Sequence, residues 1–152
     1  MKRTYIITLL LSVCSLWAYA QDSYFEKFAD MDGVTSVYIT KAMFNLMPTM
    51  KTEGVNIGSI ASKLDNIQIL TCEKPDIIAK LKKELAFINP KNGYEELMRI
   101  KEQGEKTTIY LKQSKNQKKE FVLVNSEEKD FTIIVITGDL SLKEIQGVVK
   151  KE

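Results

Sequence analysis

Residues 107–137, TTIYLKQSKNQKKEFVLVNSEEKDFTIIVIT, decide the fold. Three runs rich in β-branched and aromatic residues, 107–113, 121–125 and 131–137, are separated by polar segments of hairpin length. The last run, FTIIVIT, is apolar on both faces, which is typical of a central strand. This stretch therefore predicts an antiparallel meander.

The residues before the meander alternate between helix and strand patterns. SYFEKFADM at 23–31 predicts a short helix that stops at Asp32-Gly33. VTSVYIT at 34–40 alternates and predicts a half-buried strand. We expect Val37 and Ile39 to be buried beneath the helices. The opposite, exposed face of this strand carries Ser36, Tyr38 and Thr40.

The next segments repeat this strand and helix alternation. A helix begins at Lys41 and is interrupted by Pro48, and 67–72 is a second strand. PDIIAKLKKELAFI at 75–88 has an apolar stripe with lysines facing water, and Pro75 suits its first turn. The segment 94–100 fits either a helix or a strand.

The C-terminal residues predict a closing helix, because Ser141-Leu142-Lys143-Glu144 is a capping box followed by apolar residues at helical spacing. There is no linker and no internal repeat. We therefore expect one two-layer α+β domain over residues 21–152, with a mixed or antiparallel sheet and the helices packed on one face. The other, half-polar sheet face is where a partner is expected.

Residues 1–20 have the three parts of a secretory signal peptide: basic Lys2 and Arg3, an apolar run at 5–13, and Ala18-Tyr19-Ala20. The apolar run is shorter than the roughly 20 residues of a transmembrane span. Cys14 suggests lipid attachment, but Val13 is not the small residue that such processing needs. We expect an exported chain beginning at Gln21, without a lipid anchor or transmembrane span.

Charge and composition exclude several classes of function. Removing the leader leaves 22 − 2 = 20 basic residues against 20 acidic ones, so no nucleic-acid partner is expected. Lys112, Lys115, Lys118 and Lys119 form the one basic cluster, which we interpret as a solvated hairpin tip. The sequence has no histidine, which removes histidine-based triads and ordinary zinc sites.

Two chemical alternatives stay open. Met43, Met47 and Met50, with Cys72 as the single remaining thiol, are soft ligands for a copper-type metal or a redox response. A carboxylate-based enzyme would use Glu95-Glu96 or Glu127-Glu128 with Tyr38 or Tyr110. Adjacent carboxylates point to opposite faces of a strand, which disfavours an acid/base pair. Asp30-x-Asp32-Gly33 runs straight into a strand and is interpreted as a turn, not a calcium loop.

Three segments follow the signal peptide in order: FADMDGVTSVYITKAMFNLMP at 28–48, YEELMRIKEQGEKTTIYLKQ at 94–113 and FTIIVITGDLSLKEI at 131–145. Together they resemble the secreted bacterial family catalogued as domain of unknown function 4252. The resemblance covers nearly the whole exported chain. It implies the cell envelope of a Gram-negative, Bacteroidetes-type bacterium, and it brings no active-site residue.

The leading hypothesis is therefore a non-catalytic, periplasmic or outer-envelope module that binds a protein or peptide and needs no cofactor. Its expected binding surface comprises the polar strand face and the methionines, namely Ser36, Tyr38, Thr40, Met43, Met47 and Met50.

Overall fold

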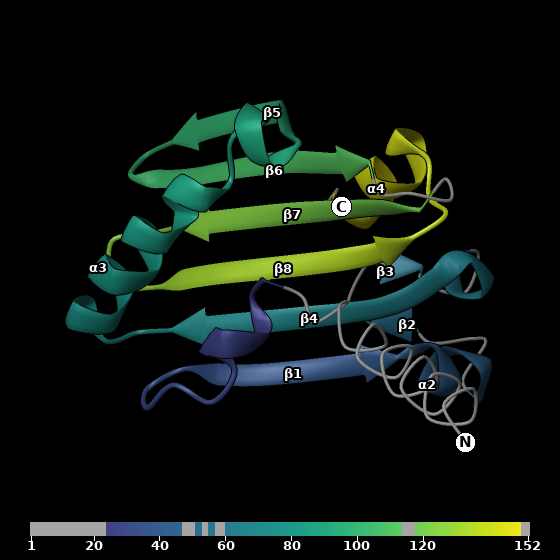
Figure 1. The fold of residues 1–152 in the computed structure, drawn as a ribbon, viewed down its shortest axis with the longest axis horizontal. Helices are drawn as coiled ribbons and strands as arrows, with labels where there is room; N and C mark the ends of the chain where they lie inside the picture. The colour runs from purple at the N-terminus through teal and green to yellow at the C-terminus, as the bar shows by residue number, and fades with distance from the viewer. Residues whose placement is uncertain (1–23, 47–50, 53–54, 57–59, 114–117, 150–152) are drawn as a thin grey trace, which may run out of the picture.

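The computed structural model describes residues 24–46, 51–52, 55–56, 60–113 and 118–149. A six-stranded sheet of order β1-β4-β8-β7-β6-β5 dominates the fold, and all of its neighbouring strands are antiparallel (Figure 1). Its strands are β1 (Thr35–Thr40), β4 (Leu64–Cys72), β5 (Tyr94–Glu102), β6 (Glu105–Gln113), β7 (Lys119–Ser126) and β8 (Phe131–Gly138). The short strands β2 (Lys51–Thr52) and β3 (Val55–Asn56) pair separately.

Three α-helices and four short 3-10 turns complete the described part of the chain. The α-helices are α2 (Lys41–Leu46), α3 (Pro75–Glu84) and α4 (Leu142–Val149). The 3-10 turns are η2 (Glu26–Phe28), η4 (Ala61–Lys63), η5 (Leu85–Phe87) and η6 (Pro90–Asn92). The α+β class is confirmed.

The meander predicted from residues 107–137 is confirmed as β6, β7 and β8, which are consecutive neighbours in the sheet. The ambiguous segment 94–100 is strand, since it lies within β5. Propensity favoured a helix there, but pairing with β6 along its whole length decides for the strand.

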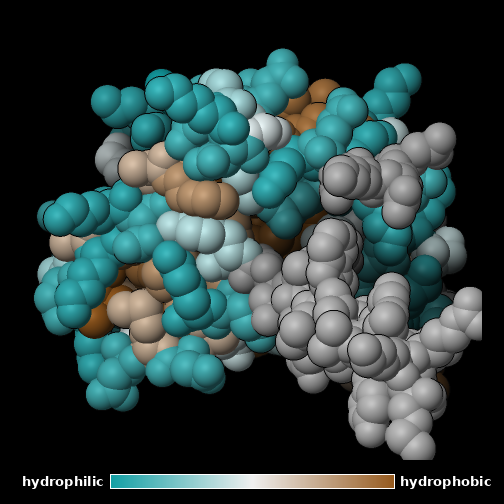
Figure 2. Space-filling model, viewed as in Figure 1, coloured by the Kyte–Doolittle hydropathy of each residue, from teal (hydrophilic) through white to brown (hydrophobic). Residues whose placement is uncertain are grey.

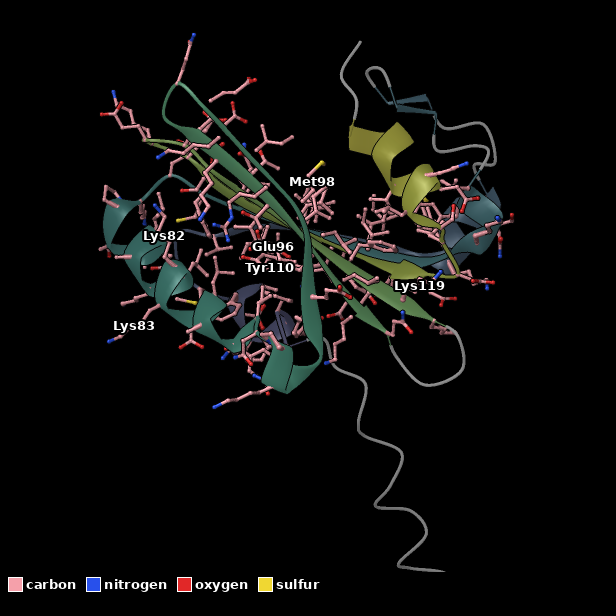
Figure 3. All side chains as sticks on the ribbon, turned by 90° about the horizontal axis from the view of Figure 1, so that it is seen from above. Lys82, Lys83, Glu96, Met98, Tyr110 and Lys119 are labelled. Carbon is pink, nitrogen blue, oxygen red and sulfur yellow. The ribbon has the colours of Figure 1, made fainter. Side chains whose placement is uncertain are left out.

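The sheet has a core on each face, so the expectation of helices on one face is wrong. Leu70, Val122 and Ile133 belong to a buried cluster with α3, and we call this side the α3 face. Ile67, Phe121 and Ile136 belong to a second cluster, which also contains Phe44 of α2 and Ile145 of α4; this side is the α4 face. Figure 3 shows α3 and α4 on opposite sides of the sheet.

The reason is the alternation of side chains along the central strand. In β8, Phe131, Ile133 and Val135 point to the α3 face, whereas Ile136 points to the α4 face. A strand that is apolar on both sides must be covered on both sides, and α3 alone covers only one of them.

Local sequence signals set the helix ends. Pro75 is in the first turn of α3, as predicted, and α2 ends at Leu46, before Pro48. The capping box of α4 is confirmed, because Glu144 Oε2 accepts the Ser141 N–H at 2.7 Å and Ser141 Oγ accepts the Glu144 N–H at 3.4 Å. The N-terminal helix predicted at 23–31 is reduced to the single turn η2.

Two positions of the sheet have unusual surroundings, one for its close packing and one for its buried polar side chain. Gly138, at the end of β8, lies against the η4–β4 connection, since a Cβ placed there would be 2.3 Å from the Lys63 carbonyl oxygen. Gln68, in β4 on the α3 face, is only 1% exposed. Within the described residues, neither its Nε2 nor its Oε1 has a hydrogen-bond partner.

Candidate partner-binding edge of the sheet

The two outer strands, β1 and β5, differ in how their edges are protected. β5 has a bulge between Glu96 and Met98, and charged side chains occupy Glu95, Glu96, Arg99, Lys101 and Glu102. β1 reads TSVYIT, pairs with β4 in unbroken register and carries no charge and no proline. Bulges and charged side chains are the usual means of preventing an edge strand from pairing with another chain. The outer edge of β5 is therefore protected against such pairing, whereas the outer edge of β1 is open to it.

The bulge in β5 is visible in its side-chain directions. Figure 3 shows Glu96 and Tyr110 on the α3 side of the sheet and Met98 on the other side. Glu96 is paired in register with Tyr110, and its carboxylate forms an ion pair with Arg99. The outward edge of β5 therefore lies beside a charged pair, which an added strand would have to desolvate.

The exposed positions of β1 include those predicted from sequence. Ser36, Tyr38 and Thr40 are exposed, and Tyr38 keeps 52% of its surface. Val37 is also 45% exposed, so the prediction that Val37 is buried is wrong, while Ile39 is half-buried. Within the part of the chain that the structure describes, β1 pairs only with β4.

The register explains the difference between Val37 and Ile39. Ile39 is opposite Ile67, which belongs to the buried α4-face cluster. Val37 is opposite Ile69, which is only partly buried. The elements that cover the α4 face lie toward the Ile39 end of β1, and Val37 is beyond them.

Exposed apolar side chains gather on β1 and α2. Six large hydrophobic residues of the described part are exposed, and four of them are Val37, Tyr38, Met43 and Leu46. Phe44 supplies the buried side of α2. Met47 and Met50 lie outside the described residues. Figure 2 shows mostly hydrophilic residues on the face that α3 crosses, with small apolar areas between them.

Ion pairs anchor the junction of β1 and α2. Asp65 Oδ2 is 2.8 Å from Lys118 Nζ, and Asp65 Oδ1 is 3.4 Å from Lys41 Nζ. These hydrogen bonds, that of Lys118 foremost, lower the pKa of Asp65 below its ordinary value. The end of β1 is thereby tied to the start of β4, and one lysine of the basic cluster serves this structural role.

The two carboxylate pairs named from the sequence lie on β5 and on the connection between β7 and β8. Glu95 and Glu96 occupy successive positions of β5 and face opposite sides of the sheet, as predicted. Glu127 and Glu128 lie with Glu102 and Glu105 around a solvent-open depression between two hairpin turns, and all four are exposed.

The tyrosines named as catalytic candidates are far apart in the sheet order. Tyr38 is on β1, and Tyr110 is on β6, with three strands between them. Burial, and secondly Glu96, raise the pKa of Tyr110. Tyr94 donates to Glu120 at 2.6 Å, and burial followed by this hydrogen bond raises its pKa strongly. Both tyrosines therefore favour the neutral phenol.

The residues of the metal hypothesis are also separated. Cys72 is buried in the α3-face cluster, whereas Met43 is exposed on α2 at the other end of β4. The described residues contain no group of three or more histidine, cysteine, aspartate or glutamate side chains placed to hold a metal ion. None of the described helices is both long and apolar enough to cross a membrane.

The comparison with known families is decisive for membership. The model of the family described as Domain of unknown function (DUF4252) matches residues 24–148. The chain belongs to this family. The match begins just before η2 and ends within α4, so it spans the whole sheet of this DUF4252 domain. No curated protein and no solved structure matches the chain significantly.

Sequence reasoning missed Val37 and Leu46 as surface residues of this family member. The contrast between uncharged TSVYIT and charged YEELMRIKE was visible in the sequence. The sequence does not show which two strands lie at the edges of the sheet. Their identity depends on the pairing of β4 with β8, which is distant in the sequence.

Proposed function

We propose that this protein is a non-catalytic module of the cell envelope that binds an extended protein segment along the open edge of β1. The predicted signal peptide at 1–20 supports the location. The observation that carries the binding role is the contrast between the two edges, with β5 bulged and charged and β1 regular and uncharged.

The physical basis is strand addition. Alternate residues of an edge strand turn their backbone N–H and C=O groups away from the sheet, where an extended chain accepts and donates hydrogen bonds. Exposed Val37 on the α4 face and Tyr38 on the α3 face then contact alternate side chains of that chain. Main-chain bonds supply affinity, and the side chains on the two faces supply selectivity.

Two lysine substitutions test the role of the edge. Val37 and Ile100 are 45% and 41% exposed, and both lie on the α4 face, one on each edge strand. Val37→Lys gives β1 the kind of charge that guards β5, whereas Ile100→Lys adds a charge where several exist already. Because both side chains are largely exposed, both variants should melt within a few degrees of the wild type.

The measurement is capture of partners from an envelope extract, with the purified full-length protein as bait. Val37→Lys should reduce the amount of each specifically retained partner at least about tenfold, corresponding to roughly 1.4 kcal/mol. Ile100→Lys should retain it. Equal capture by the wild type and Val37→Lys would show that β1 is not the binding edge.

A further inference from the structure

The open strand β1 is nearly symmetric about its own central residue. Residues 36–40 read SVYIT, so Tyr38 is flanked by the β-branched residues Val37 and Ile39 and then by the hydroxyl residues Ser36 and Thr40. Reversing the direction of the strand leaves the order of side-chain types unchanged. A foreign peptide makes no use of this symmetry, but a second copy in antiparallel orientation does.

The faces of the sheet permit this pairing. Ser36, Tyr38 and Thr40 point to the α3 face, because their partners in register are Leu70, Gln68 and Asn66. Directly opposed residues of an antiparallel pair point to the same face. A two-fold axis through Tyr38 opposes Ser36 to Thr40, Val37 to Ile39 and Tyr38 to its own copy, so each face of the sheet continues without interruption.

The charges that flank β1 favour the antiparallel arrangement. Exposed Asp30 and Asp32 precede the strand, and exposed Lys41 follows it. Antiparallel pairing brings the acidic flank of one copy toward the basic flank of the other, whereas parallel pairing would bring like charges together. Between the flanks, β1 has no charge that would oppose its copy.

We propose that two copies of this chain join along β1, related by a two-fold axis at Tyr38, into one continuous antiparallel sheet. The proposal rests on the proposed function, since it names the partner of the same edge. Exposed Val37 and Tyr38 would be covered in both copies. Two paired six-residue strands bury less surface than a standard interface of about 1,600 Å². We therefore expect a weak dimer that is best detected by covalent trapping with a disulfide.

Cysteine trapping tests the register directly. In Tyr38→Cys, the two new thiols face each other across the axis, with Cα atoms about 4.5–5.5 Å apart, within the range that a disulfide spans. In Ser36→Cys, the symmetry-related positions are displaced by four residues, about 13 Å, and do not bridge. Both are made in a Cys14→Ala background, and Cys72 is buried.

The full-length variants are oxidised mildly at several concentrations and separated without reductant. Tyr38→Cys should give a covalent dimer at a yield at least about ten times that of Ser36→Cys, and a mixture of Ser36→Cys with Thr40→Cys should give the heterodimer. In sedimentation velocity, the dimer seen for the wild type should be lost in Val37→Lys and kept in Ile100→Lys.

Two results overturn the proposal. One is a Tyr38→Cys protein that stays monomeric, and the other is equal trapping of Ser36→Cys. If Val37→Lys still abolishes capture of an envelope partner in either case, β1 remains a binding edge and only its self-pairing is wrong. If Val37→Lys changes neither sedimentation nor capture, the proposed function fails as well.

Discussion

Replacing Gln68 by leucine should make this protein more stable. Gln68 is 1% exposed and lies in β4 between Tyr38 of β1 and Val135 of β8 in the register of the sheet. Its amide nitrogen and oxygen have no hydrogen-bond partner among the described residues. In the unfolded chain, both atoms bind water, and in the folded chain no described residue replaces these bonds. Leucine has a similar size and no such bonds to lose.

The expected gain follows from the cost of an unmade hydrogen bond. A buried polar group without a partner costs about 1–3 kcal/mol, so Gln68→Leu should raise the free energy of unfolding by about that amount. In a domain of this size, the melting temperature should rise by about 2–4 °C for each kcal/mol. Few single substitutions stabilise a protein, which makes the direction informative.

Thermal and urea unfolding measure the effect, and Thr108→Val is the control. Thr108 is the other buried polar residue of the described chain, 3% exposed, and its hydroxyl is not among the unpartnered atoms. Thr108→Val should therefore be neutral or destabilising by about 0.5–1.5 kcal/mol. A Gln68→Leu protein that unfolds at lower urea than the wild type would mean that Gln68 is hydrogen-bonded, and the reasoning would be refuted.

Two further predictions concern the start of β4 and helix α4. Gly138→Ala should lower the free energy of unfolding by about 1–3 kcal/mol, because the added Cβ would lie 2.3 Å from the Lys63 carbonyl oxygen. Gly104→Ala is the control, since a Cβ there has nothing within 4 Å and only the positive φ of the backbone disfavours it. Equal melting of the two alanine variants would contradict this. Lys63, and then Ser141, lower the pKa of Glu144 from 4.5 to about 2. On acidification, Glu144 is protonated in the unfolded chain at a higher pH than in the folded chain. The stabilisation of the folded state by the Glu144 carboxylate is therefore complete above about pH 4.5 and is lost as the pH falls toward 2. The difference in urea midpoint between the wild type and Glu144→Gln should therefore close over that range, and a difference independent of pH would be inconsistent with it.

The local patterns in the sequence predicted the elements well. The strand runs TTIYLKQ and FVLVN, the apolar stripe after Pro75 and the capping box at Ser141 each depend on neighbours within a few residues, and each is confirmed. The position of the helices was wrong, although FTIIVIT carried the relevant signal. A strand that is apolar on both faces requires cover on both, and that requirement conflicts with helices on a single face.

Burial at the edge could not be predicted from alternation. Val37 and Ile39 have the same pattern, yet Val37 is 45% exposed and Ile39 is half-buried. The difference arises from α2 and its neighbours, which cover only one end of the α4 face. Similarly, the unmade bonds of Gln68 follow from its long-range neighbours, and nothing in NIQIL distinguishes them.

The place of β8 in the sheet has a consequence for the order of folding. β8 is the last of the described strands in sequence, yet it separates β4 from β7. Hairpins within β5–β8 close over short turns, whereas Ile69 of β4 must find Ile134 of β8 across 134 − 69 = 65 positions. During synthesis, the N-terminal half therefore emerges without one neighbour and with its apolar sheet faces uncovered. The domain completes its core only when residues 131–138 arrive, so nascent chains that stop before β8 should be recognised as unfolded.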